Sequence, residues 1–346
     1  MNTSTKGISV IICVYNGASR LYKTLHCIAN QEQVDCISVE VIVIDNASTD
    51  NTAILVQSIW TDLGNPFPLK IFSESKPGKS NALVLGFMKA QYDYLLICDD
   101  DNRLFPDYLA KAFEIMENHS DIGVLGGQGI PDFESKPPFW FETYKHFFAV
   151  GKQLPESGEI LNPYNSIYSA GAIIRKSIWD DLMKIDFKFL LTTLRDKNPI
   201  SGEDTELFEM VRMMGYKLWV NNEMIFRHYL PSARVTWRYL TKFTFGIGRS
   251  NIYTHAYIYC QTNNVNPATK LKFPFWFDKY IHTGIQMKRF WKITFINIFS
   301  KMEGDKTFLL YQGYRGRLFE LRKIKEGYST LYDTILRFKL RIKELK

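Results

Sequence analysis

The sequence has no long apolar run. Its longest near-continuous one, at residues 8–14, is far shorter than the roughly 18 residues that a membrane span needs. The N-terminus lacks a basic segment followed by an apolar one, so we expect no secretory signal. Apolar residues, 46% of the chain, follow neither a heptad nor a Gly-x-y period, which excludes a coiled coil and a collagen helix. The 346 residues instead suit one large globular domain or two ordinary ones.

Cysteine is scarce and has no metal-binding spacing. The five residues are odd in number, and no two form a Cys-x-x-Cys pair. Cys13 and Cys98 lie inside apolar runs that are typical of strands. We therefore expect reduced, mostly buried thiols in a cytoplasmic protein.

Charge is unevenly distributed. Residues 271–346 contain 17 Lys and Arg against seven Asp and Glu, a local net charge of +10, which leaves −3 for the rest of the chain. A basic, aromatic-rich tail favours an anionic partner, either a membrane surface or an anionic lipid-linked substrate, with nucleic acid as a further alternative. A solvated helical face would account for the same charge without any partner.

The first half of the chain alternates strand and helix patterns. Apolar runs predict buried strands at residues 8–14, 39–44 and 94–98, and shorter strands are expected at residues 69–72 and 122–125, which continue the alternation. Helical spacing of apolar residues predicts helices over residues 21–28, from Ser80 onward, and from Pro106, because proline is common at the first position of a helix. Repeated β-α units predict an α/β fold, with a mostly parallel sheet and helices on both faces.

Ligands bind such sheets at the carboxyl ends of the strands. The candidates at these ends are Val14, Tyr15 and Asn16, then Asp45, and then Asp99, Asp100 and Asp101. Three adjacent carboxylates repel one another unless a cation neutralises them, and Asp99 and Asp101 can turn toward the same ligand. Such oxygen ligands suit Mg²⁺ or Mn²⁺, which commonly bridge to phosphates. The alternative is a turn and helix cap ahead of Pro106.

Two glycine motifs fail as nucleotide fingerprints. The segment GGQG at residues 126–129 has Pro131 close behind it and opens no amphipathic helix, so it is rejected as a dinucleotide-binding fingerprint. Gly78-Lys79-Ser80 looks like the end of a P-loop, but Ser73 stands in place of its first glycine. Lys79 therefore either meets a phosphate at the start of its helix or lies solvated in a turn.

The second half contains an acidic helix start and an aromatic, basic tail. Residues 201–204 (SGED) precede an expected helix that ends before Gly215. By themselves these residues are typical of a favourable N-terminal cap. Aromatic residues at 139–148 either face an acceptor sugar or fill the core. Beyond residue 234 we expect helices, and residues 272–301 mix aromatic and basic side chains as membrane-interface helices do.

Six segments, in their order along the chain, resemble the family 2 glycosyltransferases, which are inverting enzymes with the GT-A nucleotide-sugar fold. They are ISVIICVYNGA, VEVIVIDNASTDNT, PGKSNALVLGF, YLLICDDDNRLFPDYL, SAGAIIRKSIWDDL and SGEDTELFEMVRMMGY, between about residues 7 and 250. The resemblance implies a GT-A catalytic domain at residues 1–232, with a nucleotide-binding half (1–128) and an acceptor half (129–232). A helical C-terminal region at residues 233–346 would follow.

The resemblance also implies roles at the nucleotide. Tyr15 and Asp45 would contact the base or the ribose, and Lys79 and Asn81 would lie near the nucleotide. Gly171 resembles the small residue of the donor-sugar strand. Two departures are Val14, where a threonine is frequent, and Asn46, where many relatives have a second aspartate.

The same resemblance implies a metal site and a base. Asp99 and Asp101 match the D-x-D motif that holds the diphosphate through Mn²⁺ or Mg²⁺. His228, after an expected short strand at residues 224–226, resembles a histidine that completes this site, although a lone histidine is more often structural. Asp204 would take the proton of the acceptor hydroxyl as it attacks the anomeric carbon, while the metal stabilises the departing diphosphate. Glu203 would orient the acceptor or a loop.

The resemblance implies a metal-dependent, hexosyltransferase-like enzyme that moves a sugar from a nucleotide-diphosphate sugar, UDP favoured, to a hydroxyl of a glycan or lipid-linked acceptor. Its expected role is cell-surface polysaccharide synthesis, in the cytoplasm or peripherally on the inner face of the membrane, with no nucleic-acid partner. The alternatives are a non-catalytic nucleotide-sugar or glycan-binding protein, and a sugar-nucleotide pyrophosphorylase. The latter needs a glycine-rich, basic loop, for which residues 16–20 are too poor. Without a Q-x-x-R-W motif or membrane spans, single-sugar addition is favoured over polymer synthesis.

Overall fold

The computed structural model describes residues 6–191, 202–263, 276–290 and 303–345, which form two compact units. Unit 1 comprises Met1–Glu134, Lys145–Asp186 and Gly215–Leu230. Unit 2 comprises Ser135–Tyr144, Phe187–Met214 and Pro231–Lys346. The predicted domain boundary at residue 232 stays a prediction.

Unit 1 is built on one mixed sheet. Its described strands are β1 (Gly7–Val14), β2 (Ser38–Asn46), β3 (Leu69–Glu74), β4 (Tyr94–Asp99), β5 (Asn102–Leu104), β6 (Ile122–Phe133), β7 (Gly158–Glu159), β8 (Ile173–Arg175) and β9 (Lys217–Leu230). Their order is β3-β2-β1-β4-β8-β6-β9-β5, with β7 also paired to β9. The pairs along β3-β2-β1-β4 are parallel, as is β6–β9, whereas β8 runs antiparallel to both of its neighbours. The predicted α/β class is confirmed.

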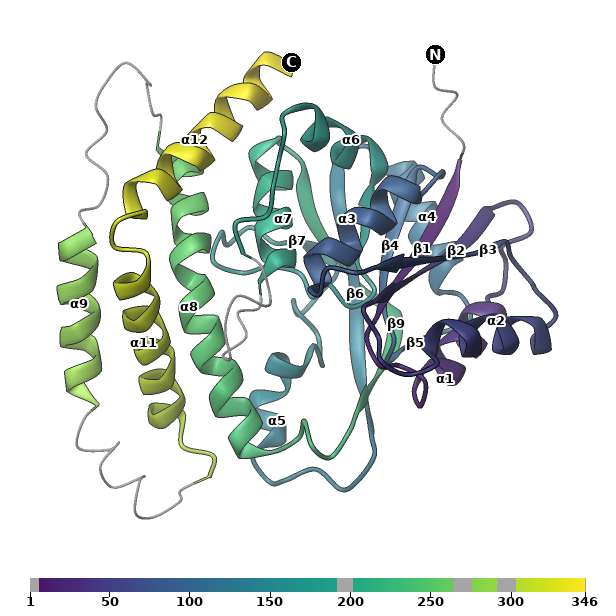
Figure 1. Ribbon diagram of the computed structural model, residues 1–346, viewed down its shortest axis with the longest axis horizontal. Helices are drawn as coiled ribbons and strands as arrows, with labels where there is room; N and C mark the ends of the chain where they lie inside the picture. Colours follow the sequence, from purple (N-terminus) through teal and green to yellow (C-terminus); the bar gives the residue numbers. More distant parts are fainter. Residues whose placement is uncertain (1–5, 192–201, 264–275, 291–302, 346) are drawn as a thin grey trace. The chain divides into compact units, whose positions relative to one another are not determined.

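Helices cover both faces of this sheet (Figure 1). Alternate β1 residues, Ile8, Val10 and Ile12, join the core cluster with α1 (Leu21–Ala29), α2 (Thr52–Asp62) and α4 (Tyr108–Asn118). On the other face lie α3 (Lys79–Lys89) and α6 (Lys176–Lys184), which meet through an edge-on contact of Phe87 with Trp179. Helix α3 comes so close to the sheet that a Cβ at Gly86 would lie 2.5 Å from Ile11.

Three sequence predictions need correction. The strands expected at residues 122–125 and 224–226 are longer, because β6 and β9 pair with each other well beyond their apolar parts. Gly127 of the GGQG segment serves this pairing, since a Cβ there would lie 2.4 Å from the Met224 carbonyl oxygen of β9. Helix α4 begins at Tyr108 rather than Pro106, because a turn comes first, in which Tyr108 N–H donates to the Phe105 carbonyl.

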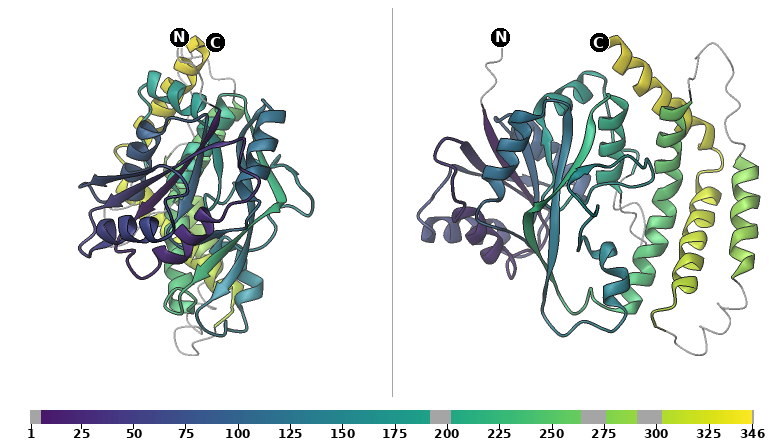
Figure 2. Two further views of the ribbon diagram at one scale, coloured as in Figure 1. Left: turned by 90° about the vertical axis from the view of Figure 1, so that its right-hand side faces the viewer. Right: turned by 180° about the vertical axis from the view of Figure 1, so that it is seen from behind.

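Unit 2 is helical. Its described helices are α5 (Phe141–Tyr144), α7 (Glu203–Met213), α8 (Trp237–Thr262), α9 (Trp276–Arg289), α11 (Lys306–Lys323) and α12 (Tyr328–Leu345). Helix α11 lies between α8 and α9 in both Figure 1 and Figure 2. A buried ion pair of 2.8 Å between Arg249 and Glu320 joins α8 to α11. The predicted C-terminal helices are confirmed, although the expected segment 272–301 is described only over residues 276–290. No described helix combines the length and apolarity needed to cross a membrane.

Candidate functional site

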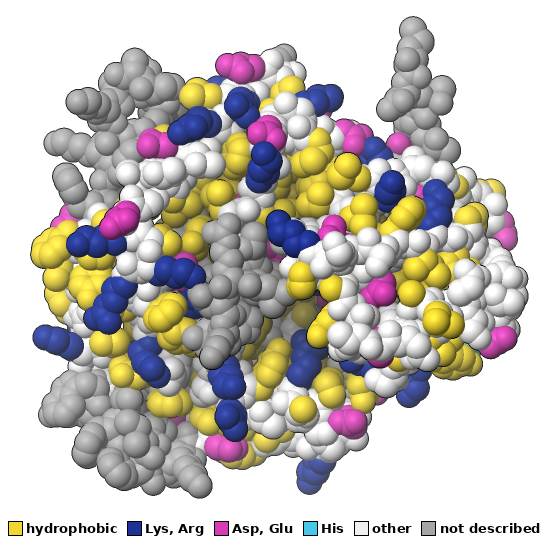
Figure 3. All heavy atoms as spheres, in the orientation of Figure 1, with side chains coloured by type: hydrophobic (Ala, Val, Ile, Leu, Met, Phe, Trp, Pro, Cys, Tyr) yellow, Lys and Arg dark blue, Asp and Glu magenta, His cyan; other side chains and the backbone are white. Residues whose placement is uncertain are grey.

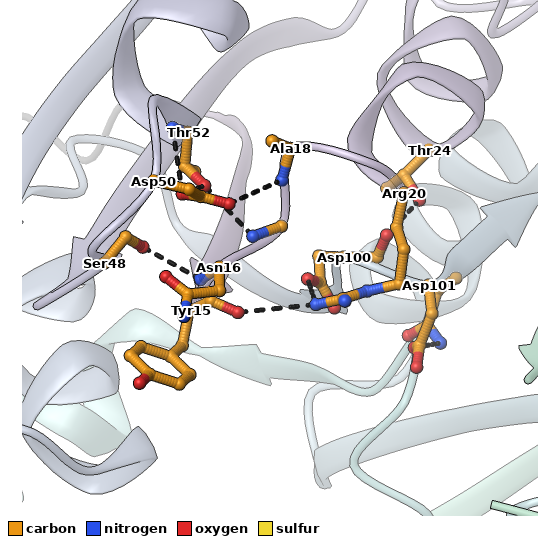
Figure 4. Close-up of polar contacts among 12 residues, drawn as sticks. Tyr15, Asn16, Ala18, Arg20, Thr24, Ser48, Asp50, Thr52, Asp100 and Asp101 are labelled. Atoms are coloured by element: carbon orange, nitrogen blue, oxygen red, sulfur yellow. Dashed lines mark hydrogen bonds and ion pairs between the residues drawn. The ribbon is translucent and has the colours of Figure 1, made fainter. Parts of the chain in front are cut away.

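The loops that follow β1 and β2 are tied to each other. Asn16, in the left-handed region at φ 48°, donates its N–H to Ser48 Oγ (3.0 Å), and its side-chain oxygen accepts from Thr49 N–H (2.8 Å). Asp50 accepts from Ala18 N–H at 3.4 Å (Figure 4). The predicted ligand-binding residue Asn16 thus helps to hold two adjacent loops in one conformation.

Tyr15 and Asp45 lie at neighbouring strand ends. The parallel register pairs Val14 with Asp45, and Tyr15 directly follows with 58% of its surface exposed. The Val14 side chain is buried in the core, so a ligand at this strand end would meet its backbone. Asp45 Oδ1 accepts from Ser48 N–H at 3.2 Å. The structure therefore brings these residues together, and their contact with a nucleotide stays a prediction.

Buried Asn46 organises the turn that starts α3. Its Nδ2 donates to the carbonyls of Lys76 (2.9 Å) and Glu74 (3.3 Å), and its Oδ1 accepts from Gly78 N–H (2.7 Å). Gly78 has φ 128° and precedes Lys79, the first residue of the helix. Sequence reasoning treated Asn46 as a departure from the family and missed this role.

Asn81 belongs to the same turn. Its Nδ2 donates to the carbonyls of Pro77 (3.0 Å) and Lys76 (3.3 Å), and the side chain is close to solvent. These contacts assign Asn81 to holding the start of α3, and leave its predicted proximity to a nucleotide as a prediction.

The three carboxylates at the end of β4 face different partners. Asp99 Oδ1 lies 2.5 Å from Lys79 Nζ, Asp100 pairs with Arg20, and Asp101 Oδ1 lies 3.4 Å from His228 Nε2. Burial, followed by the charge of Asp101, raises the pKa of Asp100 to about 6, whereas Arg20 acts in the opposite direction. The expected repulsion is thus relieved in part by the protein's own cations. Arg20, whose guanidinium contacts both the Tyr15 carbonyl and Asp100 (Figure 4), was missed, and the excess of acidic charge was the signal for it.

Asp101 and His228 form a buried pair. His228 Nδ1 donates to the Phe148 carbonyl at 2.7 Å, which directs the Nε2 lone pair of the neutral ring toward Asp101. A lone pair that faces a carboxylate is favourable only with a proton or a cation between them. Tyr229 N–H donates to the Asp101 carbonyl (2.9 Å), and β5 pairs Asn102 with His228, so the backbone fixes this geometry.

Asp101 and His228 fit a metal ion whose other ligands are phosphate oxygens of a bound substrate and water. Across the described residues, no group of three or more His, Cys, Asp or Glu side chains is arranged to hold a metal. Mg²⁺ and similar ions are commonly held by one or two carboxylates together with phosphate oxygens and water. Asp101 and His228 offer one oxygen and one nitrogen donor for such an ion, while Asp99 already contacts Lys79. The ligand roles of all three stay predictions.

Gly171 lies beside the end of β4. Its N–H donates to the Ile97 carbonyl (2.9 Å), and its carbonyl accepts from Tyr108 Oη (2.7 Å). A side chain is disfavoured here, because φ is +73° and a Cβ would lie 2.5 Å from Tyr108 Oη. This backbone geometry explains the glycine, and its role at a donor sugar stays a prediction.

The predicted catalytic residues begin α7 in unit 2. Gly202, with φ 129°, precedes the helix, and Glu203 Oε2 accepts from its N–H at 3.1 Å. Asp204 Oδ1 accepts from Thr205 N–H at 2.7 Å, and the side chain is half-buried. The helix ends at Met213, and Gly215 follows with φ 93°, as predicted.

A third acidic residue of this helix was missed. Glu206 is buried and accepts from Leu190 N–H (2.8 Å), Leu191 N–H (2.9 Å) and Tyr257 Oη (2.7 Å). Burial raises the pKa of Glu206 to about 7, although these hydrogen bonds oppose the shift. The only signal in the sequence was a third carboxylate in the first turn.

Most aromatic residues of the 139–148 segment are core residues. Trp140 and Tyr144 are buried in unit 2 against Trp237, at ring-centroid distances of 5.5 Å and 5.9 Å. Phe139 is the exception, with 81% of its surface exposed. Phe141 and Phe148 are buried as well, so the core interpretation holds for these four rings.

The family model described as Glycosyl transferase family 2 matches residues 9–182, half of the chain. A dolichol-phosphate mannosyltransferase of Pyrococcus furiosus is 28% identical over 219 residues, which cover 61% of this chain and 57% of that protein. A poly-beta-1,6-N-acetyl-D-glucosamine synthase of Staphylococcus aureus is 30% identical over 182 residues, which cover 51% of this chain and 42% of that protein. The chain thus spans about half the length of these curated relatives.

Solved structures share the fold. A Pyrobaculum calidifontis mannosyltransferase in complex with GDP-Man and Mn²⁺ has a TM-score of 0.53 and 16% identity, over 99% of this chain and 87% of that one. Residues 1–349 of S. aureus TarS in complex with UDP-GlcNAc have a TM-score of 0.51 and 16% identity, over 94% and 92%. The match to the family model confirms the resemblance seen in the six sequence segments: the chain belongs to glycosyl transferase family 2.

Proposed function

We propose that the protein is a metal-dependent, inverting glycosyltransferase that uses a nucleotide-diphosphate sugar, with UDP favoured. The observation that carries the proposal is the buried Asp101–His228 pair at the end of the Asp99–Asp101 segment, in a chain of family 2. Structural neighbours bind GDP-Man or UDP-GlcNAc, which supports this donor class.

The residues of unit 1 are suited to hold the donor. Tyr15 and Asp45, at adjoining strand ends, would flank the base and ribose. Lys79 begins α3, where its charge and the helix N–H groups favour phosphate. A divalent cation held by Asp101 and His228 would neutralise charge on the departing diphosphate.

Asp204 is proposed as the general base. Its carboxylate would take the proton of the acceptor hydroxyl while that oxygen bonds to the anomeric carbon and the bond to the diphosphate breaks. A single displacement inverts the anomeric centre and needs no covalent intermediate. Glu203, which accepts from Gly202 N–H, would hold the start of α7 in place.

The acceptor is proposed to be a glycan or lipid-linked hydroxyl in cell-surface polysaccharide synthesis, used by an enzyme that works peripherally at a membrane. The likeness to a bacterial polysaccharide synthase and the +10 charge of residues 271–346 support this placement.

Asp204→Asn tests the assignment. Loss of a general base should lower the transfer rate by about 10²-fold to 10⁴-fold, while the affinity for the donor changes little. Transfer is followed by release of the nucleoside diphosphate, and donor affinity by calorimetry. Exposed Asp62→Asn, at the end of α2, is the matched control. Transfer by Asp204→Asn at a rate comparable to wild type would show that the base is misassigned. If the wild-type protein binds the donor but transfers no sugar, the result would favour a non-catalytic sugar-nucleotide-binding protein.

A further inference from the structure

Helix α9 carries apolar side chains on two different faces. The inner face is accounted for within unit 2: Trp276 Nε1 donates to the Leu321 carbonyl (2.6 Å), and Arg322 Nε donates to Tyr280 Oη (2.9 Å). Thr283, one helical turn further on, is buried. These contacts dock α9 on α11.

The outer face is apolar but exposed. Phe277, Ile281 and Ile285 recur every fourth residue, so they form one stripe, with 61%, 42% and 50% of their surfaces exposed. A Cβ at Gly284, beside this stripe, would meet nothing within 4 Å. Figure 3 shows hydrophobic side chains with neighbouring Lys and Arg at the left-hand edge, where Figure 1 draws α9. A helix that docks on its domain normally presents polar residues outward, so this stripe calls for a partner of its own.

Charge selects the class of partner. Lys288 continues the stripe at the C-terminal end of α9, Arg289 lies beside it, and Asp278 is the one acidic residue of this helix. A second copy of the chain would bring together two C-terminal regions of net charge +10 each. An anionic lipid surface offers both an apolar layer and the opposite charge.

We propose that α9 lies on an anionic lipid surface, with Phe277, Ile281 and Ile285 in the boundary between headgroups and acyl chains. Lys288 and Arg289 would then meet the headgroups. This inference identifies the element behind the proposed membrane placement, but it does not require the transfer chemistry.

Vesicle flotation of the full chain tests the proposal. The vesicles contain phosphatidylcholine, alone or with phosphatidylglycerol. Wild type should float with the anionic vesicles at low salt, less at high salt, and little with phosphatidylcholine alone. The double variant Ile281→Gln/Ile285→Gln should lose about tenfold or more in partitioning, because two aliphatic side chains no longer enter the lipid. Its thermal midpoint should match wild type, since both side chains are exposed.

Two controls make the result specific. Ile54→Gln makes the same chemical change on α2 at a side chain with 75% exposure, and this variant should float as wild type does. Asp204→Asn should also float as wild type does, so a failed base assignment and a failed docking surface give different results.

Three outcomes would overturn the proposal. One is a wild type that stays unbound with anionic vesicles at low salt. Another is a double variant that floats as well as wild type. The third is a lipid-free dimer, measured by light scattering, that the double variant converts to monomer, because the stripe would then be a contact between two copies.

Discussion

Asn46 shows how one buried amide can determine the position of a neighbouring charge. It donates to two carbonyls and accepts one N–H in the turn before Lys79. An aspartate of the same shape has no N–H to donate. Asn46→Asp should therefore leave the Glu74 and Lys76 carbonyls without this partner and place a negative charge against them. We expect a loss of about 1–3 kcal/mol in the free energy of unfolding, measured by urea denaturation.

Asn162→Asp is the control for that change. The Asn162 side-chain oxygen accepts from Tyr164 N–H, a contact that aspartate retains. An Asn46→Asp variant as stable as this control would mean that the turn at residues 74–78 does not depend on the amide.

Glu206 makes stability depend on pH. Burial raises the pKa of Glu206 to about 7 in the folded chain, against an ordinary value of about 4.5 for the carboxyl group. Between these values the folded state binds more protons than the unfolded state, so stability falls as pH rises from about 4.5 to 7 and then levels off. The contribution lost is up to roughly 3 kcal/mol. Urea denaturation across this range should show a flatter pH dependence in Glu206→Gln than in wild type.

The Gln variant should also be less stable throughout, because its NH₂ group cannot accept from Leu191 N–H as Oε2 does. Exposed Glu114→Gln on α4 is the control. Equal slopes for Glu206→Gln and wild type would show that another group is responsible.

At the scale of elements, glycines set how closely α8 and α11 approach. A Cβ at Gly248 would lie 2.0 Å from the Gly313 carbonyl oxygen, whereas a Cβ at Gly313 would come no nearer than 3.9 Å to Thr244. Gly248→Ala should therefore lower the free energy of unfolding by about 1–3 kcal/mol or more, through overpacking. Gly313→Ala should be neutral or stabilise by up to about 1 kcal/mol, because alanine favours the helix. Thermal unfolding of the two variants compares them, and equal destabilisation would contradict this packing.

The elements that the sequence predicted well are those with a strong local signal. Strands β1, β2 and β4 follow from apolar runs, because a strand buried on both faces needs them. The full lengths of β6 and β9 could not be predicted, since the added parts contain polar residues such as Gln128 and Arg227 and are held by pairing of the two strands with each other. Such pairing depends on residues about 100 positions apart and leaves no local pattern.

The candidate site divides in the same way. Its place at the strand ends followed from topology, and the Asp99–Asp101 segment lies there. The pairing of each carboxylate with its cation could not be predicted from the sequence, because Arg20 comes from the loop after β1, 80 residues away from Asp100. Loop conformation, which the residue types alone do not specify, decides these pairs.

For the molecule as a whole, ligand binding should appear as stability. Because Asp101 and His228 give only two donors, Mn²⁺ should bind weakly by itself and more tightly with a diphosphate that supplies further oxygens. A ligand at 100 times its Kd stabilises the folded state by about 2.7 kcal/mol. The Tm should therefore rise more with UDP and Mn²⁺ together than the two separate shifts would add up to.

Binding linkage makes this prediction strict. If Mn²⁺ increases the affinity for UDP by some factor, UDP must increase the affinity for Mn²⁺ by the same factor. Asp101→Ala should abolish the coupling in both directions while a smaller shift with UDP alone remains, and Asp62→Ala should leave the coupling intact. Thermal shift with UDP, GDP, dTDP, ATP and NADH, each with and without Mn²⁺, measures the coupling and identifies the nucleobase of the donor. A coupling that survives in Asp101→Ala would show that the metal binds elsewhere. A thermal shift with NADH alone would contradict the proposed donor class, because a sugar-nucleotide site would not explain that stabilisation.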